Sequence, residues 1–315
     1  MAPTISAIVP TYNRAGYVCR AIDSILQQSV LPNEIIIVDD GSSDGTSSML
    51  QSRYQDRVRV IEQANGGVSV ARRTGLEASS GDWIAFLDSD DEWLPGRLET
   101  MVRAAERLDD NVVCLFGDTV VRRDNHVDTN LFEEQAFDTP ESLTVFRDAL
   151  PTQFPYMFSL LDSSLIRREA LMKTGAFLEG LRTSEDFLAN FRLALHHSFA
   201  AIPDVVTRIY RTEDLKQSSL DRGQNQTVDY HRARMLAFSE AWAVRGDGSW
   251  RGHYRHVAIR LTQMQIKDGS NAIGAALDQF RYGVTPRALA WALAAVASPL
   301  WPRRRPTPRR TSEIA

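Results

Sequence analysis

Apolar and polar residues alternate with two different periods over the first third of the chain. Four short apolar runs have the composition of buried strands, and they lie at residues 5–9, 34–38, 58–61 and 83–87. Helix-like stretches separate these runs, at residues 17–28, 46–54 and 68–78. The run EIIIV is largely β-branched, which is typical of a strand covered on both faces. Strands that alternate with helices predict a mostly parallel α/β sheet with flanking helices.

The pattern changes along the rest of the chain. Residues 95–108 and 187–196 have helical periodicity, whereas 112–121 and 205–210 have strand character. From residue 229 onward only helical patterns occur, at residues 230–244, 250–267, 272–282 and 285–300. We therefore expect an α/β unit over residues 1–221 and a helical C-terminal region over residues 222–315.

Polar residues stand directly after several of the predicted strands. Thr11 and Asp39 each follow an apolar run, and Asp88 follows the last of the four. Ligands of open α/β sheets bind in the crevice beyond the carboxyl ends of the strands. These side chains are therefore expected to line one edge of the same crevice.

The stretch AFLDSDDEW gathers four acidic residues, Asp88, Asp90, Asp91 and Glu92. Like charges this close repel and raise one another's pKa unless a cation or hydrogen-bond donors compensate. An apolar strand that delivers Asp-x-Asp to a sheet edge favours Mg²⁺ or Mn²⁺ shared with the phosphates of a ligand. The alternative is a solvated acidic turn before a helix, where Asp91 and Glu92 support the turn or the helix N-terminus.

The stretch VDDGSSDGT has two competing interpretations. A Gly-rich turn would use Ser42 or Ser43 to cap the next helix, whereas a ligand site would use Asp39 as a hydrogen-bond acceptor. A calcium loop is excluded, because counting from Asp40 places Gln51 where an EF-hand has glutamate.

Composition excludes several classes of protein. The chain has 315 residues, a net charge of -4 and 43% hydrophobic residues, as expected for a folded soluble protein. It has no global basic field, so nucleic acid is not the expected partner. Cys19 and Cys114 stand in no disulfide or zinc pattern, which favours a reducing, cytoplasmic setting. The N-terminal residues lack a basic region and a long apolar segment, so we expect neither signal peptide nor anchor there.

Phosphatases of the haloacid-dehalogenase type also place Asp-x-Asp after an apolar strand. Their pattern continues with Thr or Val where this chain has Glu92, and they need a downstream lysine. Lys173 is the nearest one and stands in no matching context. This class is therefore disfavoured.

Four stretches together carry a family resemblance: AIVPTYNRAGYVCRAIDSILQQS, EIIIVDDGSSDGT, NGGVSVARRTG and GDWIAFLDSDDEW. In this order and spacing they resemble the glycosyltransferase family 2 enzymes of GT-A fold. The resemblance implies an inverting enzyme with a nucleotide-sugar donor, most often UDP-linked. It also implies a nucleotide-sugar half over about residues 1–110 and an acceptor half over about residues 111–221.

The matching motifs imply roles for individual donor-side residues. Thr11 and Tyr12 would line the nucleotide pocket, and Asp39 would bind the uracil edge. Arg72 would approach the base or the diphosphate; the alternative is a surface helix residue. The resemblance further implies that Asp88 contacts the ribose side. Asp90 would ligate Mn²⁺ or Mg²⁺. Where the family usually has asparagine after the arginine, this chain has Arg73.

The stretch LRTSEDFLANF resembles the Glu-Asp motif of the family. The resemblance makes Asp186 the expected catalytic base and Glu185 an acceptor-side or positioning residue. The alternative is that Ser184 caps the helix and both acids favour its first turn. Further along, Arg211 would approach the diphosphate, and a histidine sometimes found in this segment of the family is missing here.

The C-terminal tail combines an apolar stretch with arginines over residues 285–310. The apolar part is shorter than the ~20 residues that span a membrane. Two interpretations stay open: a helix packed on the protein, and a helix lying on an anionic membrane surface. The second would make the protein peripheral on the cytoplasmic face of the inner membrane.

The sequence thus predicts an inverting, metal-dependent glycosyltransferase. It would move a sugar from a nucleotide-sugar, UDP-linked by resemblance, to a hydroxyl of a glycan or lipid-linked acceptor in surface polysaccharide synthesis. One alternative is a sugar nucleotidyltransferase, although PTYNRAGY is a poor version of its Gly-rich phosphate loop. The other is a non-catalytic glycan-binding or scaffold protein of the same fold.

Overall fold

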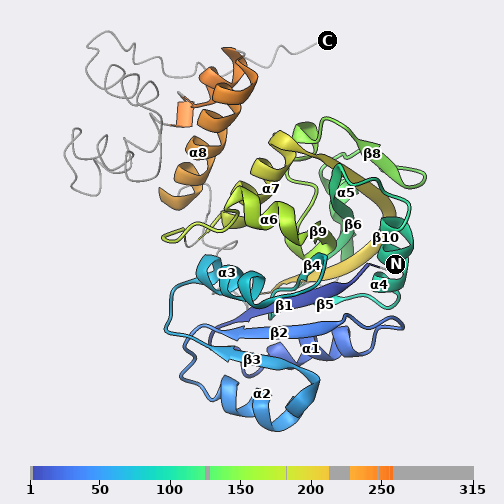
Figure 1. The fold of residues 1–315 in the computed structure, drawn as a ribbon, viewed down its shortest axis with the longest axis vertical. Coiled ribbons are helices and arrows are strands. Elements are labelled where there is room, and N and C mark those ends of the chain that lie inside the picture. Colours follow the sequence, from blue (N-terminus) through green and yellow to red (C-terminus); the bar gives the residue numbers. More distant parts are fainter. Residues whose placement is uncertain are drawn as a thin grey trace, which may run out of the picture.

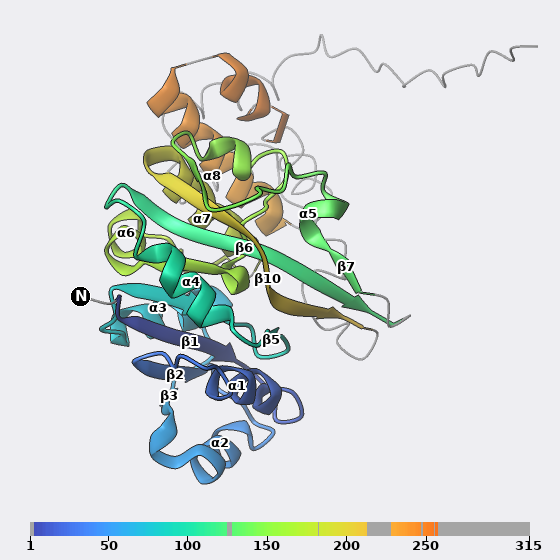
Figure 2. The ribbon, with the colours of Figure 1, turned by 90° about the vertical axis from the view of Figure 1, so that its right-hand side faces the viewer.

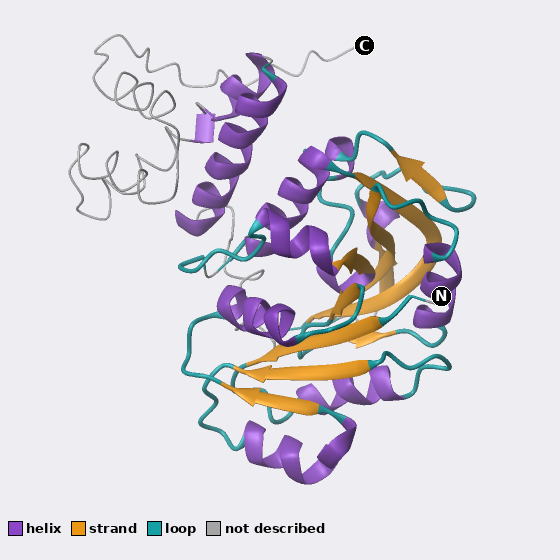
Figure 3. Cartoon of the chain, in the orientation of Figure 1, coloured by secondary structure: helices purple, strands orange, loops and turns teal. Residues whose placement is uncertain are grey.

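The structure is a computed structural model. It describes residues 3–124, 128–181, 183–212, 228–246, 248–254 and 256–257. One continuous twisted sheet runs through the molecule, with helices on both of its faces (Figures 1 and 3).

The first part of the chain forms the predicted βα units. The strands are β1 (Ile5–Thr11), β2 (Glu34–Asp39), β3 (Arg59–Glu62) and β4 (Trp83–Phe86). The helices between them are α1 (Val18–Leu26), α2 (Thr46–Tyr54), with η1 (Gln55–Arg57) after it, and α3 (Val68–Ala78). β1 pairs in parallel with β2 and β4, and β2 pairs in parallel with β3. The expectation of a mostly parallel α/β sheet is therefore confirmed.

The sheet continues past β4 with strands from later in the sequence. These are β5 (Glu92–Trp93), β6 (Val112–Arg123), β7 (Asp128–Asn130), β8 (Thr144–Phe146), β9 (Ser164–Arg167) and β10 (Ser198–Arg211). The order is β3-β2-β1-β4-β9-β6-β10-β5, with β7 paired to β6 and β8 paired to β10. β9 is antiparallel to both β4 and β6, so it joins two groups of strands that point the same way.

Strand β10 is longer than the sequence pattern predicts, because it begins at Ser198 rather than near Val205. Pro203 interrupts the strand pattern, since proline cannot donate to the ladder. The structure accommodates it with shifts of register between Ala201 and Thr207. The long β6 and β10 lie side by side in Figure 2.

The remaining helices cover the later strands. They are α4 (Arg97–Ala105), α5 (Leu131–Glu134), α6 (Arg168–Thr174), α7 (Glu185–His196) and α8 (Val228–Arg245), with η2 (Leu150–Thr152) and η3 (Leu161–Ser163). The helix predicted at 95–108 starts later, because Gly96 adopts a φ of 78° in the turn before it.

The core lies on both faces of the sheet. One face buries Ile8 and Phe86 together with residues of α7 and α8, and the other buries Val9 and Ile22. Helix α8 therefore packs into the same apolar cluster as the α/β unit. The division of the chain at about residue 222 stays a prediction.

Most of the predicted C-terminal region lies outside the described residues. This applies to the helices predicted at 272–282 and 285–300 and to the tail at 285–310. Within the described part, no helix combines the length and the apolar character needed to cross a membrane.

Helix α3 lies unusually close to β1, and Gly75 makes this possible. A Cβ atom at Gly75 would stand 2.4 Å from Cγ2 of the buried Ile8. Gly16, by comparison, has no heavy atom within 4 Å of such a Cβ. The glycine thus lets the helix that carries Arg72 pack directly on the sheet.

We predict that Gly75→Ala lowers the free energy of unfolding by about 1–3 kcal/mol, because overpacking forces α3 away from β1. The higher helix propensity of alanine opposes this by about 1 kcal/mol at most. Urea denaturation measures the change, with Gly16→Ala as the control. Equal stability of the two variants would contradict the close packing of α3.

Candidate active site

The carboxyl ends of β1 and β2 bring together two predicted donor-site residues. Thr11 and Asp39 are direct partners in the parallel pairing, and both are buried. The neighbouring Tyr12, directly after the end of β1, is 49% exposed. One carboxylate oxygen of Asp39, Oδ1, accepts hydrogen bonds from the backbone N–H and the hydroxyl of Ser42.

The loops after β1 and β2 are tied to each other. The backbone N–H of Asn13 donates to Oγ of Ser42 at 2.8 Å, and that of Ser43 donates to Oδ1 of Asn13 at 2.8 Å. Helix α2 begins after Gly45 without a side-chain cap, so the expectation that Ser42 or Ser43 caps it is wrong. The serines instead fix the loops that frame the edge.

Asp40 has a structural role. Its carboxylate accepts hydrogen bonds from the side chain of Gln63 at 2.7 Å and from the backbone N–H groups of Gly66 and Gly67 at 2.9 and 2.7 Å. These contacts hold the loop that leads into α3. They therefore help to set the position of Arg72.

Arg72 is the link between the two halves of the site. Its side chain is 4% exposed, and it donates through Nη1 to Glu185 and through Nη2 to Asp88. These two charges and those of Asp162 and Asp186 raise the pKa of Arg72 against the effect of burial. Arg72 is therefore buried, and the alternative of a surface helix residue is wrong. Its contact with the base or the diphosphate stays a prediction.

Three carboxylates converge beneath the end of β4. Among the described residues, Asp88, Asp91 and Asp162 each offer an oxygen, and these oxygens lie within 4.8 Å of one another. Burial and the charge of Asp88 raise the pKa of Asp162 to about 8. Burial and the charge of Asp162 raise the pKa of Asp91 well above its ordinary value. Close carboxylate oxygens, two of them on buried side chains, are a donor set that a hard divalent cation fits.

The fold holds these acids in place through backbone contacts. Oδ1 of Asp162 accepts the backbone N–H of Asp88 at 3.0 Å, and Oδ1 of Asp91 accepts that of Tyr210 at 2.9 Å. Helix α4 begins at Arg97 with Glu99 as the acid of its first turn, so Asp91 and Glu92 do not support its N-terminus, and their support of the turn stays a prediction. Asp91 binds β10, and Glu92 pairs with Arg208 across β5 and β10.

Asp90 lies beside this group but is not one of its three members. Its side chain is 15% exposed and forms an ion pair with Nη2 of Arg14 at 3.5 Å. Its backbone carbonyl accepts a hydrogen bond from Arg20, whose guanidinium lies 3.7 Å from the ring centre of Tyr210. Burial and the charge of Asp88 raise the pKa of Asp90. The role of Asp90 as metal ligand stays a prediction.

Asp162 is the site residue that the sequence analysis missed. It belongs to η3, in a stretch of leucines and serines that matches no motif of chemistry. An acid inside an apolar run is the one signal that marks it. The contact with Asp88 crosses 74 positions of sequence, so local patterns carry no trace of it.

The predicted base stands at the start of α7. Asp186 follows the buried Glu185, and its Oδ1 accepts the backbone N–H of Phe187 at 2.7 Å. Burial raises the pKa of Asp186, and the positive charge of Arg72 opposes this. Ser184 occupies the N-cap position with a φ of 62° and no side-chain cap bond, so capping by its hydroxyl is not found.

Arg211 lies further along the sheet. It ends β10 opposite Arg123 of β6, and its charge helps to lower the pKa of Glu134. Its neighbour Tyr210 contacts the acidic group through its backbone N–H. Contact of Arg211 with a diphosphate stays a prediction.

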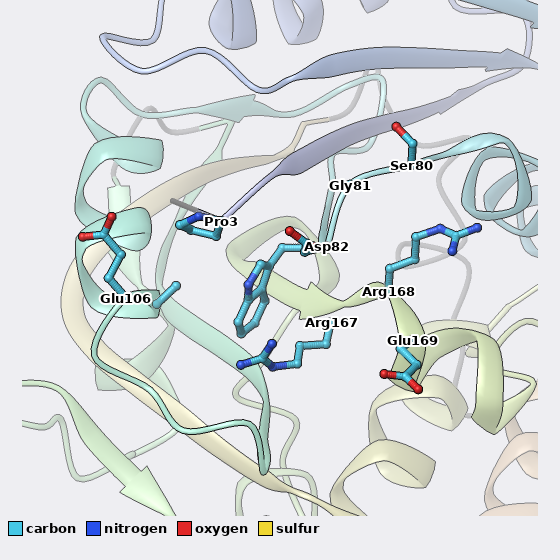
Figure 4. A pocket seen from close by; sticks show the side chains of 10 residues that line it. Pro3, Ser80, Gly81, Asp82, Glu106, Arg167, Arg168 and Glu169 are labelled. Atoms are coloured by element: carbon cyan, nitrogen blue, oxygen red, sulfur yellow. The ribbon is translucent and has the colours of Figure 1, made fainter. Parts of the chain in front are cut away.

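A pocket of 770 Å³ lies elsewhere, at the amino-terminal ends of β1 and β4. Its lining includes Pro3, which precedes β1, and Trp83, which begins β4 (Figure 4). Arg167 stacks on Trp83 there, with 4.7 Å between the guanidinium and the ring centre. Asp88, Asp91 and Asp162 are not part of its lining.

Solved structures have the same fold. The crystal structure of S. aureus TarS residues 1–349 in complex with UDP-GlcNAc superposes with a TM-score of 0.63 at 18% identity. The match covers 92% of this chain and 87% of the TarS chain. The predicted GT-A fold is therefore confirmed.

Curated sequences give closer relatives. The uncharacterized glycosyltransferase EpsJ of Bacillus subtilis is 33% identical over 190 residues, which are 59% of this chain and 54% of EpsJ. TuaG of Bacillus subtilis, a putative teichuronic acid biosynthesis glycosyltransferase, is 43% identical over 100 residues, 31% of this chain and 40% of TuaG. The chain thus matches about half the length of EpsJ and a smaller share of TuaG.

The model of the family described as Glycosyl transferase family 2 matches residues 6–175. With more than half of its length matched, the chain belongs to glycosyltransferase family 2.

Proposed function

We propose that this protein is an inverting, metal-dependent glycosyltransferase that moves a sugar from a UDP-sugar to a hydroxyl of a glycan or lipid-linked acceptor. The observation that carries the proposal is the buried Arg72, which pairs with Asp88 at the donor edge and with Glu185 beside the predicted base. One side chain thereby ties the two halves of a transfer site together.

The donor half of the proposal rests on the strand ends. Thr11 and Asp39 lie side by side with the exposed Tyr12 after Thr11, and Asp88 follows the next strand of the sheet. A free carboxylate oxygen beside an aromatic side chain suits a nucleobase with N–H donors. The complex of TarS with UDP-GlcNAc supports a UDP-sugar as the donor, and the name of TuaG supports a role in surface polysaccharide synthesis.

The metal would be held by carboxylates at the end of β4. Asp88, Asp91 and Asp162 form one candidate set, and Asp90 is the ligand that the family resemblance implies. A bound Mn²⁺ or Mg²⁺ would offset the negative charge of the diphosphate as UDP leaves. Arg14, in an ion pair with Asp90, adds a positive charge at the same place.

Asp186 is the proposed base. Its carboxylate would accept the proton of the acceptor hydroxyl while the hydroxyl oxygen bonds to the sugar and the bond from the sugar to UDP breaks. One in-line displacement of this kind inverts the configuration of the sugar carbon. Burial raises the pKa of Asp186, which makes its carboxylate a stronger proton acceptor.

The proposal also covers the tail at residues 285–310, as a contact with an anionic membrane surface that brings the enzyme to a lipid-linked acceptor. A sugar nucleotidyltransferase and a non-catalytic glycan-binding protein are the competing functions. The nucleotidyltransferase would form a nucleotide-sugar from a sugar phosphate. The glycan-binding protein would catalyse no reaction. Release of UDP from a UDP-sugar with acceptor present, measured below, is expected of the transferase and of neither alternative.

We predict that Asp186→Asn lowers the rate of transfer by ~10²–10⁴-fold, because the amide cannot take the hydroxyl proton. Binding of UDP should stay within about twofold of the original protein. Transfer is measured by release of UDP from a panel of UDP-sugars with acceptor present. Asp204→Asn, an exposed change in β10, is the control. Full activity of Asp186→Asn would remove Asp186 from the role of base.

Removing the metal should weaken donor binding. We expect Mn²⁺ to tighten the binding of UDP by about tenfold or more in calorimetric titrations, and EDTA to reverse this. Asp90→Asn and Asp162→Asn, measured side by side, show which carboxylate carries the effect. Equal UDP affinity with and without metal would overturn metal dependence, and no UDP binding at all would remove the donor assignment.

Glu185 is the proposed positioning residue, because its carboxylate is buried against Arg72. Burial raises its pKa to about 7 from the ordinary value of 4.5. Between these values the folded protein keeps a proton that the unfolded chain has lost. The free energy of unfolding therefore falls as the pH rises through this window, by at most about 1.4 kcal/mol per pH unit.

We predict that Glu185→Gln removes this part of the pH dependence between pH 5 and 7. Urea denaturation in EDTA at several pH values measures it. Glu169→Gln on α6 is the control, since Lys173 lowers the pKa of that exposed carboxyl and moves it away from the window. Identical pH slopes for Glu185→Gln and the original protein would contradict the assignment.

A further inference from the structure

Helix α8 brings its first turns to the side of the site where the predicted base lies. Arg234 contacts Phe187, and Glu240 pairs with Arg192, so the contacts advance in the same direction along α7 and α8. The two helices are therefore parallel, and they lie side by side in Figure 1. The part of α8 that carries Arg234 therefore lies beside the N-terminal end of α7, which begins at Glu185 and Asp186.

Arg234 of α8 is a cation that lies against two aromatic rings. Its guanidinium carbon lies 3.5 Å from the ring centre of Tyr230 and 4.2 Å from that of Phe187. Its Nη1 is buried and has no hydrogen-bond partner among the described residues. Within the same part of the chain, no carboxylate forms an ion pair with it. Arg14 and Arg72, which also approach the site, are each paired with an acid.

The charge of Asp186 reaches Arg234 without contact. Burial lowers the pKa of Arg234, and the negative charge of Asp186 acts in the opposite direction. Arg234 is partly buried, and a cation held between two rings gains stability when an anion completes its surroundings. Stacking on aromatic faces leaves the edge of a guanidinium free for two parallel hydrogen bonds to an oxyanion.

The position of Arg234 decides which substrate would supply the anion. The diphosphate of the donor belongs at the strand ends, where Asp88 and Asp90 lie, whereas Asp186 must meet the hydroxyl of the acceptor. A group that reaches both Asp186 and Arg234 is part of the acceptor. We propose that the acceptor carries an oxyanion, a phosphate or a carboxylate, close to the reacting hydroxyl, and that Arg234 binds it.

This inference rests on the proposed function, and it narrows the acceptor to an anionic class. Arg234 then contributes specificity through binding, not proton transfer. A purely structural Arg234, stacked only to hold α8 on α7, would make the stability of the fold depend on it and leave acceptor charge without effect. The two roles have different experimental outcomes.

The test uses the full chain saturated with UDP and Mn²⁺, so that the diphosphate site is filled. Methyl phosphate, methyl glucuronide and the neutral methyl glucoside are the probes, and binding is followed by ligand-observed NMR. We expect one of the two oxyanions to bind at least tenfold more tightly than the glucoside. Preference for methyl phosphate or for methyl glucuronide identifies the anion as phosphate or carboxylate.

Variants of α8 complete the test. Arg234→Met should weaken oxyanion binding at least tenfold with UDP affinity and melting temperature unchanged, and Arg234→Lys should recover part of it. Arg232→Met is the matched control, since Arg232 pairs with Asp229 on the same helix. Unchanged oxyanion binding in Arg234→Met, or no oxyanion binding by the original protein while UDP binds, overturns the inference alone. Failure of UDP to bind overturns the proposed function itself.

Discussion

The geometry of this molecule depends on one buried guanidinium. Arg72 holds Asp88 and Glu185, which come from the end of β4 and the start of α7. Removing a charged partner from such an arrangement leaves unpaired charge out of water, which typically costs 3–5 kcal/mol, so the three groups depend on one another. The packing of α3 through Gly75 and the loop contacts of Asp40 place the arginine where it can reach both acids.

A second buried arginine, Arg97, contacts the backbone that carries the acidic residue Asp162. Arg97 is 1% exposed, stacks on Trp93 at 4.0 Å and donates to the backbone carbonyls of Asp162 and Ser164 at 3.0 and 3.1 Å. Burial lowers its pKa to about 9. The carboxylate of Asp162 therefore faces Asp88 and Asp91 from a backbone fixed by hydrogen bonds. Acidic groups that would otherwise repel are kept close, which makes them a candidate donor set for a cation.

Local signals in the sequence predicted the parts of this site that depend on local structure. The strand ends at Thr11, Asp39 and Asp88 follow from apolar runs, and the helical pattern at 187–196 puts Glu185 and Asp186 at a helix start, where the structure has them. The residues that these side chains contact could not be predicted from local patterns. Arg72 meets Glu185 across 113 positions, and no pattern of hydrophobic residues encodes such a distance. Asp162 and the first half of β10 were missed for the same reason, since tertiary contacts decide both.

The number of residues in the irregular part of β10 determines which groups at the end of this strand face the site. Side chains of a strand alternate between faces, so the register shifts between Ala201 and Thr207 decide which face each later residue presents. Tyr210 offers its backbone N–H to Asp91 only in this phase. Loss or gain of a single residue here would exchange the two faces of the strand end. Natural variants should therefore change the residue types of this segment more readily than their number.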